Sequence, residues 1–380
     1  MENREGIWYN ENMKVESLKK ALREVKDPRR TECGNIRHKL EDILIIALCT
    51  IVCNGEDFED MEEFGKEREE FLKGFLELPH GIPDSDTFRR VFERVNPRAL
   101  SEALYGWLET VRPEGSVIAV DGKTERGSGD KWHKAYHVVS AFVAESRLTL
   151  GELAVDEKSN EITAVPELLK FLDIEKSVVT ADAMSCQSEI VKTIVNGKAD
   201  YVIAAKRNQP GLYKFIKDKF HELSAKAEKF VTPERRRSQN EERSYCLLTD
   251  LSGLPKPEKW PGLKAVGRVV TTVRKGETVH IQTRYYISSL TDTERFAYAV
   301  RKHWSIENQL HWCLDVIFHE DDSRAKKDNS PLNLNVLRKT ALSLCRNCEE
   351  ETLRKSSIQK RRYRASLNPA ILPLILFGKR

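Results

Sequence analysis

The sequence has few of the features that mark membrane-spanning or disulfide-stabilised proteins. Its most apolar early run covers only residues 42–53, which is too short for a bilayer-spanning helix and fits a buried one. The start, MENREGIWYNENMK, is polar and charged, and it shows no signal peptide. The eight cysteines are scattered. We therefore predict reduced core thiols in a cytoplasmic protein that has no membrane partner.

The sequence also has no large excess of basic over acidic residues. The chain has 63 basic and 59 acidic residues, and its net charge is +4. Composition alone therefore does not identify a nucleic-acid partner, and any basic footprint must be local. The 380 residues are enough for two or three domains with a large core.

The first part of the chain, residues 1–113, is predicted to be an all-helical domain. Apolar residues recur there at helical spacing, and Pro83 with Asp84 or Ser85 marks a helix start. Arg89 and Arg90 project from that short helix. The predicted helices cover residues 38–55, 57–78, 82–95 and 96–111.

The pattern changes at Gly115, where we predict an α/β core in the order β-β-β-α-β-α-β. The strands are expected at 116–121, 136–145, 147–155, 176–182 and 200–206, and the helices at 159–173 and 185–199. The first three strands can form an antiparallel meander, and the crossover helix then lays the fourth strand parallel to an earlier one.

Two of these strands end in an acid, at Asp121 and at Asp182. Ligand sites in such sheets lie beyond the carboxyl ends of adjacent parallel strands. If the first and fourth strands are neighbours, the two carboxylates meet at one sheet end. A helix that supplies a third acid would complete a site for a divalent metal.

The remaining chain divides into three parts. Residues 209–294 are predicted to be a β-rich insertion, with a hairpin formed by 265–275 and 278–290. The core resumes at 295–345 with a long helix at 293–318 and a last helix at 333–346. We take 114–208 as the first part of the core and 346–380 as a basic C-terminal tail.

The stretch HWSIENQLHWCLD places a potential metal ligand at every fourth residue: His303, Glu307, His311 and Asp315. Positions four apart lie on one face of a helix. This face is either a zinc site, a solvated polar surface, or one wall of a larger site.

The chemistry of magnesium favours the alternative that this face is one wall of a larger site. Mg²⁺ prefers a few carboxylate ligands, with water molecules and substrate phosphate completing its coordination. Glu307 is then the expected ligand beside Asp121 and Asp182, and His303 and His311 support it or hold phosphate. The acidic run Glu320, Asp321 and Asp322 is the alternative source of the third acid.

Several long motifs resemble the DDE transposases of bacterial insertion sequences, and in particular the H-repeat-associated group. They are VIAVDGKTERGS, DEKSNEITAVPELL, VVTADAMSCQ, DYVIAAKRNQP and RKHWSIENQLHWCLDVIFHEDDSR, and the likeness extends to HKLEDIL and GIPDSDTF near the start. The resemblance covers nearly the whole chain. It implies a ribonuclease H-like mixed-sheet core with Asp121, Asp182 and Glu307 as the acidic triad.

The resemblance also implies the chemistry and the partners. Two Mg²⁺ or Mn²⁺ ions would assist DNA cleavage at the element ends and attack of the freed 3′-hydroxyl on target DNA. The partners would be double-stranded DNA, as terminal inverted repeats and target, and further copies of the chain in the active complex. Such a protein acts at the bacterial nucleoid.

The sequence departs from the wider superfamily in several positions. The Tyr-Arg-Glu-Lys signature around the last acid has Val300, His303 and Leu314 in place of Tyr, Arg and Lys. Tyr298 and Arg301 lie nearby. Glu125 and Arg207 stand where group members often have an apolar residue and a glycine, and Glu125 is expected near the DNA path.

Basic residues in three regions are predicted to contact DNA. The basic residues are Lys206 and Arg207 after the fifth core strand, Arg89 and Arg90 in the helical part, and Lys360, Arg361, Arg362 and Arg364 in the tail. The polar Asn208 is predicted to contact DNA beside Lys206 and Arg207. Lys123, Arg301, His303 and His311 are predicted to lie around the acids or to hold phosphate. Two alternatives to a transposase remain: a decayed DNA-binding remnant, and a nuclease without strand transfer.

Overall fold

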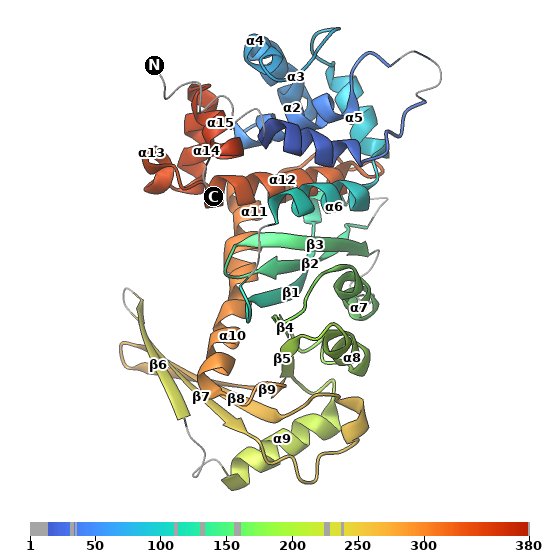
Figure 1. Cartoon of the computed structure of the whole chain (residues 1–380). Helices are drawn as coiled ribbons and strands as arrows, with labels where there is room; N and C mark the ends of the chain where they lie inside the picture. The colour runs from blue at the N-terminus through green and yellow to red at the C-terminus, as the bar shows by residue number, and fades with distance from the viewer. Residues whose placement is uncertain are drawn as a thin grey trace.

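The computed structural model describes residues 14–30, 34, 36–109, 113–129, 134–155, 161–223, 229–236 and 239–378. Helices gather at one end, and a sheet runs from them to the other end (Figure 1). The chain start at 1–13, Cys33 and the predicted helix start at Ser159 or Asn160 lie outside the described residues.

The first helices are α2 (Leu40–Val52), α3 (Phe58–Glu67), α4 (Glu69–Lys73), α5 (Ser85–Arg94) and α6 (Pro97–Leu108). The apolar run at 42–53 forms most of α2, and nearly every side chain of that helix is buried. The prediction of a buried helix there is confirmed. Among the helices that the structure describes, none combines the length and the apolar character needed to cross a bilayer.

The central elements are β1 (Val117–Thr124), β2 (His137–Val143), β3 (Leu148–Val155), α7 (Glu161–Phe171), β4 (Val178–Ala181), α8 (Ser188–Asn196) and β5 (Asp200–Ala205). The strands β1, β2 and β3 pair antiparallel, and β4 lies parallel to both β1 and β5. The predicted order is therefore confirmed, and so is the prediction that the fourth strand lies parallel to an earlier one, which is β1.

The strand β1 is longer than predicted, because it continues past Asp121 to Thr124 by pairing with β2. Its parallel ladder with β4 ends earlier, at Val120 and Ala181. Thus Asp121 and Asp182 each follow the last pair of the same parallel ladder, although only β4 ends there.

The two faces of the sheet are covered by different helices. Side chains alternate between faces along a strand. Ile118 and Val120 pack with α7 and α8, whereas Val117 packs with residues of α10 (Thr293–Ser305). Asp121 is four residues after Val117 on the same strand, so its side chain lies on the same face of the sheet and faces α10.

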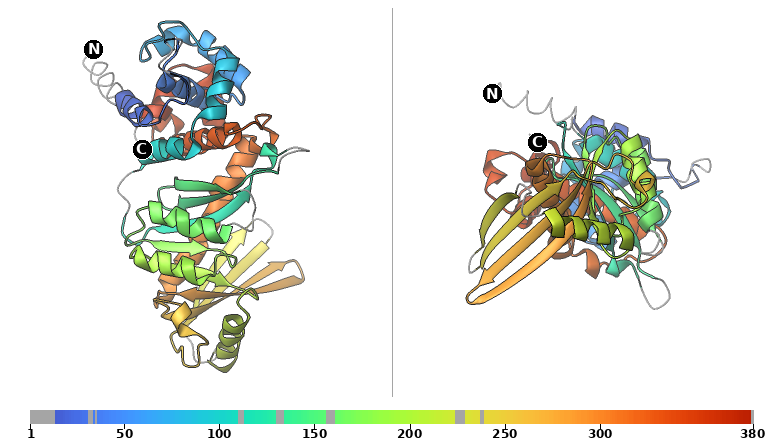
Figure 2. Two further views of the ribbon diagram at one scale, coloured as in Figure 1. Left: turned by 90° about the vertical axis from the view of Figure 1, so that its right-hand side faces the viewer. Right: turned by 90° about the horizontal axis from the view of Figure 1, so that it is seen from below.

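The insertion contains α9 (Pro210–Leu223), β6 (Lys229–Arg236), β7 (Gln239–Leu248), β8 (Ala265–Lys275) and β9 (Thr278–Ser288). The hairpin of β8 and β9 confirms the predicted one. Because β9 pairs with β5, all nine strands form one sheet in the order β3-β2-β1-β4-β5-β9-β8-β7-β6. Strands of the insertion project beyond the rest of the molecule (Figure 2). The prediction missed α9, which buries Leu212, Ile216 and Phe220 at a spacing of four.

The helix predicted at 293–318 is not uniform. It consists of α10, a π-helical segment η5 (Ile306–His311) and α11 (Trp312–Ile317). In the π segment the amide of Trp312 bonds to the carbonyl of Glu307. Such segments are rare and often occur at functional sites. This one carries Glu307.

The last helices are α12 (Ser330–Asn347), α13 (Glu351–Arg354), α14 (Ile358–Leu367) and α15 (Ile371–Phe377). Most of α12 is buried, and it shares a hydrophobic core with α2–α6, α14 and α15. Residues 346–378 therefore complete the helical end of the molecule. Of the eight cysteines, the seven that the structure describes are buried, as predicted.

Candidate active site

The site begins where β1 and β4 stop pairing. Asp121 and Asp182 follow directly after Val120 and Ala181, the last partners of the parallel ladder. Both acids face α10 because they share the parity of Val117 and Val178, which pack against that helix. The sequence prediction that topology brings these two acids to one sheet end is thus confirmed.

A cleft of about 570 Å³ opens at this sheet end, and Asp121, Asp182 and Glu307 all line it. We call it the acid-lined cleft. Its walls come from the ends of β1, β4 and β5, from β9, and from α10 with the π segment. Glu307 is the member supplied by the helix. Residues 320–322 do not line this cleft.

The electrostatics of Asp121 show how much negative charge gathers here. Burial raises the pKa of Asp121 to about 7, and Asp182, Glu161 and Glu307 add to the shift. Burial also raises the pKa of Glu307, while the positive charge of Arg284 opposes that shift. Several carboxylates close together in a poorly solvated site favour protonation or a bound cation.

The carboxylate of Asp182 is fixed by the turn that follows β4. The amides of Met184 and Ser185 donate to its Oδ1 atom, at 2.8 and 3.2 Å. Neither bond uses Oδ2. All three acids offer hard oxygen donors, the ligands that Mg²⁺ prefers. The donor chemistry of the three acids therefore fits a divalent cation. Their oxygen atoms are not among the described groups that lie within 4.8 Å of one another.

The two histidines contact different strands. His303 Nδ1 lies 3.1 Å from Thr180 Oγ1 on β4, and His311 Nδ1 lies 3.6 Å from Asp121 Oδ2. Burial lowers the pKa of His303 to about 4 and that of His311 to about 3. Both rings are therefore neutral at neutral pH and do not act there as cationic phosphate ligands.

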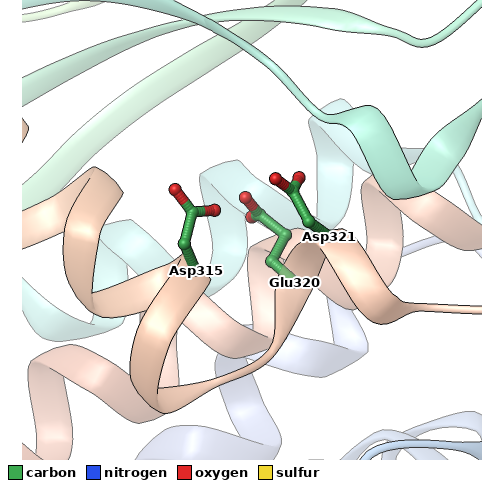
Figure 3. Close-up of side chains that lie close together, drawn as sticks. All are labelled: Asp315, Glu320 and Asp321. Carbon is green, nitrogen blue, oxygen red and sulfur yellow. The ribbon is translucent and has the colours of Figure 1, made fainter.

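The predicted zinc alternative lacks the required convergence. Within the described residues, the group of metal-ligating atoms that lie within 4.8 Å of one another is Asp315, Glu320 and Asp321. This group does not contain His303, Glu307 or His311, and it does not contain Asp121 or Asp182 either. Its residues come from α11 and the short turn η6 (Glu320–Asp322), and their carboxylates lie side by side (Figure 3).

A protein cation already neutralises this second acidic cluster. The ammonium group of Lys123 on β1 bonds to both Asp315 and Glu320. Asn335 donates to Glu320 at 2.7 Å, and the amide of Arg126 donates to Asp321 at 3.2 Å. The cluster thus links β1 to α11 and α12. Lys123 was predicted beside the acids, and its contacts show that it connects elements.

The expectation for Glu125 was wrong. It was placed near the DNA path, but its side chain is buried at 3% exposure and accepts a bond from Asn335. Burial and the charge of Glu320 raise its pKa well above the usual range. The loop after β1 turns into the protein because Gly127 packs against the backbone of Glu320 and Asp321.

Among the basic residues predicted after β5, Lys206 and Arg207 line the acid-lined cleft. Asn208 instead donates from Nδ2 to the carbonyl of Ala183, at 2.6 Å, and so ties this loop to the turn after Asp182. Arg89 and Arg90 are exposed on α5 and pair with Asp86. Neither of them lines the cleft.

The predicted basic surface of the tail needs a correction. Arg361 and Arg362 are only 7% and 1% exposed. Arg361 donates to the carbonyls of Cys345 and Cys348. Arg362 donates to that of Ile51. These guanidinium groups satisfy helix ends in the interior, where DNA does not reach them. Lys360 is exposed and Arg364 is half-buried.

Sequence reasoning missed a second cavity and one of its central residues. A groove of about 1230 Å³ lies between the strands β6–β9 and α10, and we call it the ribbon groove. It contains Arg301, which was predicted near the acids. Arg284 on β9 lines both the ribbon groove and the acid-lined cleft. No local motif marks this residue, because only the β5–β9 pairing brings it here.

The comparison with known families agrees with this architecture. The family described as "Transposase DDE domain" matches residues 112–344, and the one described as "DDE_Tnp_1-associated" matches residues 19–108. The chain belongs to the DDE transposases. The first match contains Asp121, Asp182 and Glu307, and the second spans the helices α2–α6.

Full-length relatives place this DDE transposase in the H-repeat group. "Putative transposase YncI" of Escherichia coli O157:H7 is 36% identical over 376 residues, covering 96% of this chain and 95% of that protein. "H repeat-associated putative transposase YhhI" of Escherichia coli K12 is 35% identical over 381 residues, with 96% and 99% covered.

One solved structure, a piggyBac transposase synaptic complex with hairpin DNA, matches with a TM-score of 0.43 and 12% identity. It covers 94% of this chain and 78% of that one. The signature positions of this transposase are more informative: Leu314 is fully buried, and Val300 lines the cleft as an apolar residue. Neither supplies a polar group.

Proposed function

We propose that this DDE transposase cuts DNA at the ends of its element and joins the freed ends to target DNA, using Asp121, Asp182 and Glu307. The observation that carries the proposal is that these three carboxylates, from three separate elements, line one cleft. The strand order β3-β2-β1-β4-β5 with parallel β1, β4 and β5 supports a ribonuclease H-like core.

The three acids would hold two Mg²⁺ or Mn²⁺ ions. When bound, such ions stabilise the charge on the reacting phosphate and make the attacking oxygen more nucleophilic. The raised pKa of Asp121 supports this assignment, because burial and neighbouring acids leave negative charge that a cation would compensate.

The other residues of the site prepare it for DNA. Met184 and Ser185 hold one oxygen of Asp182. His303 and His311 pack as neutral rings against β4 and Asp121 and position the helix that carries Glu307. Lys206 and Arg207 bring positive charge to the rim of the cleft and would contact the DNA backbone.

The partners would be double-stranded DNA, as terminal repeats and target, and another copy of the chain. Two element ends have to be brought together, so the active complex would contain at least two copies and would act at the bacterial nucleoid. The helical domain, with Arg89 and Arg90 exposed on α5, is the proposed contact for DNA outside the cleft.

A cleavage and joining assay tests the proposal. Purified protein is incubated with DNA that carries the inverted repeats flanking its gene, with supercoiled target DNA and Mg²⁺. We expect nicked ends and a joined product, both absent with Asp121→Asn. Cleavage without joined product would identify a nuclease. DNA binding without cleavage would identify a non-catalytic remnant, which the apolar Val300 and Leu314 would explain.

A further inference from the structure

Arg284 occupies a position that the sheet topology defines. The pairing of β5 with β9 ends at Ala205 and Tyr285. Because β9 runs antiparallel to β5, Arg284 is the first residue of β9 beyond the carboxyl end of β5. It therefore stands over the sheet end where Asp121 and Asp182 lie, and it lines the acid-lined cleft with them.

The guanidinium group of Arg284 is held by an aromatic ring. Its Cζ atom lies 4.5 Å from the ring centroid of Trp304 on α10. Stacking on an aromatic face orients a guanidinium group and leaves the N–H donors at the edges of its own plane accessible. The Arg284 side chain also forms a hydrogen bond with Tyr286, and its other N–H donors can reach a further partner. Trp304 also lines the cleft, so the stacked pair forms part of its wall.

No carboxylate neutralises this arginine. Among the residues that the structure describes, none forms an ion pair with Arg284 within 4.0 Å, whereas Arg243 in the same groove pairs with Glu241. Arg284 nevertheless lines the same cleft as Glu307 and the two aspartates. Because the guanidinium group of Arg284 lies in the cleft without an ion-pair partner among the described residues, it can bind an anionic group of a substrate.

The helix does not provide such a cation at the corresponding place. His303 stands at the signature position of the arginine, and its ring is buried and bonded to Thr180. Fork-shaped guanidinium groups bind phosphate through two parallel hydrogen bonds. A single arginine from β9 can therefore supply what the helix lacks.

We propose that Arg284 binds the scissile phosphate in the acid-lined cleft. This assignment deepens the proposed function and rests on it. The insertion then supplies a residue of the active site, because β9 belongs to the same sheet as the strands that carry the acids. Trp304 is the positioning residue that keeps the guanidinium plane turned toward the substrate.

The test compares Arg284→Gln with Arg284→Lys and with Arg274→Gln. Arg274 is a matched control, since it is exposed on the neighbouring strand β8 and lines neither cavity. Single-turnover cleavage of end DNA should fall about 100-fold in Arg284→Gln, as for loss of one donor to a developing charge. It should fall less in Arg284→Lys and change by less than about threefold in Arg274→Gln. A thermal melt checks that each variant is folded.

A binding experiment identifies the phosphate independently of turnover. End DNA with a neutral methylphosphonate at the scissile position should bind wild-type protein about tenfold more weakly than normal DNA, because one charged contact is lost. In Arg284→Gln the two DNAs should bind alike. If both proteins discriminate equally, Arg284 does not touch that phosphate. If instead Asp121→Asn still cleaves, the failure lies in the proposed function on which this assignment rests, and the comparison of the two DNAs is not its cause.

Discussion

The Nδ1 atom of His311 lies 3.6 Å from the Oδ2 atom of Asp121. One residue belongs to the π-helical segment and the other to β1, and 190 positions separate them in the sequence. The contact places the segment that carries Glu307 directly against the strand that carries the first acid. The geometry of the site therefore depends on how this segment packs on the sheet.

Replacing Asp121 or Asp182 by Asn should abolish catalysis and spare DNA binding. The change keeps the shape of the side chain and removes charge that would hold Mg²⁺, so cleavage should fall by about 10³-fold or more. Binding of end DNA, measured by gel shift, should stay within about threefold, because phosphate contacts come mainly from basic residues. A variant that still cut normally would remove that residue from the site.

Glu307 and the two histidines should differ sharply in their importance. Glu307→Gln should abolish cleavage and joining, whereas His303→Ala or His311→Ala should lower both about 10-fold to 100-fold through loss of positioning. Activity should require Mg²⁺ or Mn²⁺, and Zn²⁺ should not restore it after chelation.

Two results would contradict this assignment of the third acid. One is a tightly bound zinc ion that disappears in His311→Ala. The other is full activity of Glu307→Gln combined with loss of activity in Glu320→Gln. The second result would move the third ligand to the cluster of Asp315, Glu320 and Asp321.

Two basic residues of α14 should have different effects. Replacing Arg362 should lower the stability of the protein, and replacing Lys360 should weaken DNA binding. Arg362→Ala should destabilise the protein by about 3 kcal/mol, because it removes a buried guanidinium group that donates to the carbonyls of Ile51 and Ile317. Lys360→Ala leaves stability unchanged and should lower the salt slope of DNA binding by up to about 0.9. Urea unfolding and binding across a salt series measure the two effects. An unchanged slope would exclude a phosphate contact at Lys360.

Asp42 should make stability depend on pH. Burial, assisted by Glu41, raises its pKa to about 6 in the folded protein. The folded state then holds a proton that the unfolded state releases, so this residue lowers stability as pH rises from about 4 to about 6. At pH 8, Asp42→Asn should be more stable than wild type by up to about 3 kcal/mol, since one pKa unit corresponds to about 1.4 kcal/mol.

The gain from Asp42→Asn should vanish below pH 4, where the aspartate is protonated in both states. Glu59→Gln provides the control, because Glu59 occupies the first turn of α3 but is exposed. Chemical unfolding at a series of pH values tests both variants. A stability difference that did not change with pH would show that Asp42 is not the titrating group.

Lys123 and Glu125 should respond in opposite ways. Lys123→Met leaves Asp315 and Glu320 without their cation, and should cost about 3–5 kcal/mol. Glu125→Gln keeps an oxygen that can accept from Asn335 and removes a buried charge, so stability at pH 8 should stay equal or rise. Thermal unfolding measures both. A large loss in Glu125→Gln would mean that its charge stabilises this cluster.

Much of the site could be predicted because it depends on short apolar strands and on hydrophobic periodicity, which are visible in the local sequence. Asp121 and Asp182 follow apolar strands, and the order of strands and helices predicts that the fourth strand lies parallel to an earlier one. The structure shows that this earlier strand is β1. The buried helix α2 and the hairpin of β8 and β9 also follow from periodicity.

The rest depends on contacts between distant segments. A basic run such as KRRYR has the composition of a DNA-binding surface, but Arg361 and Arg362 are drawn inside by helix carbonyls that the local sequence does not show. Arg284 is one arginine among many until β9 pairs with β5. The π segment at Glu307 continues a helical pattern of side chains, so periodicity does not reveal it.

The position of α12 bears on how the protein is made. This helix packs against α2 and α6, yet it is translated more than 200 residues after them. During synthesis, the helices at the amino-terminal end emerge from the ribosome long before the partner that covers their apolar faces. A messenger truncated ahead of Ser330 would therefore yield a nascent chain with that surface exposed, which chaperones and proteases recognise.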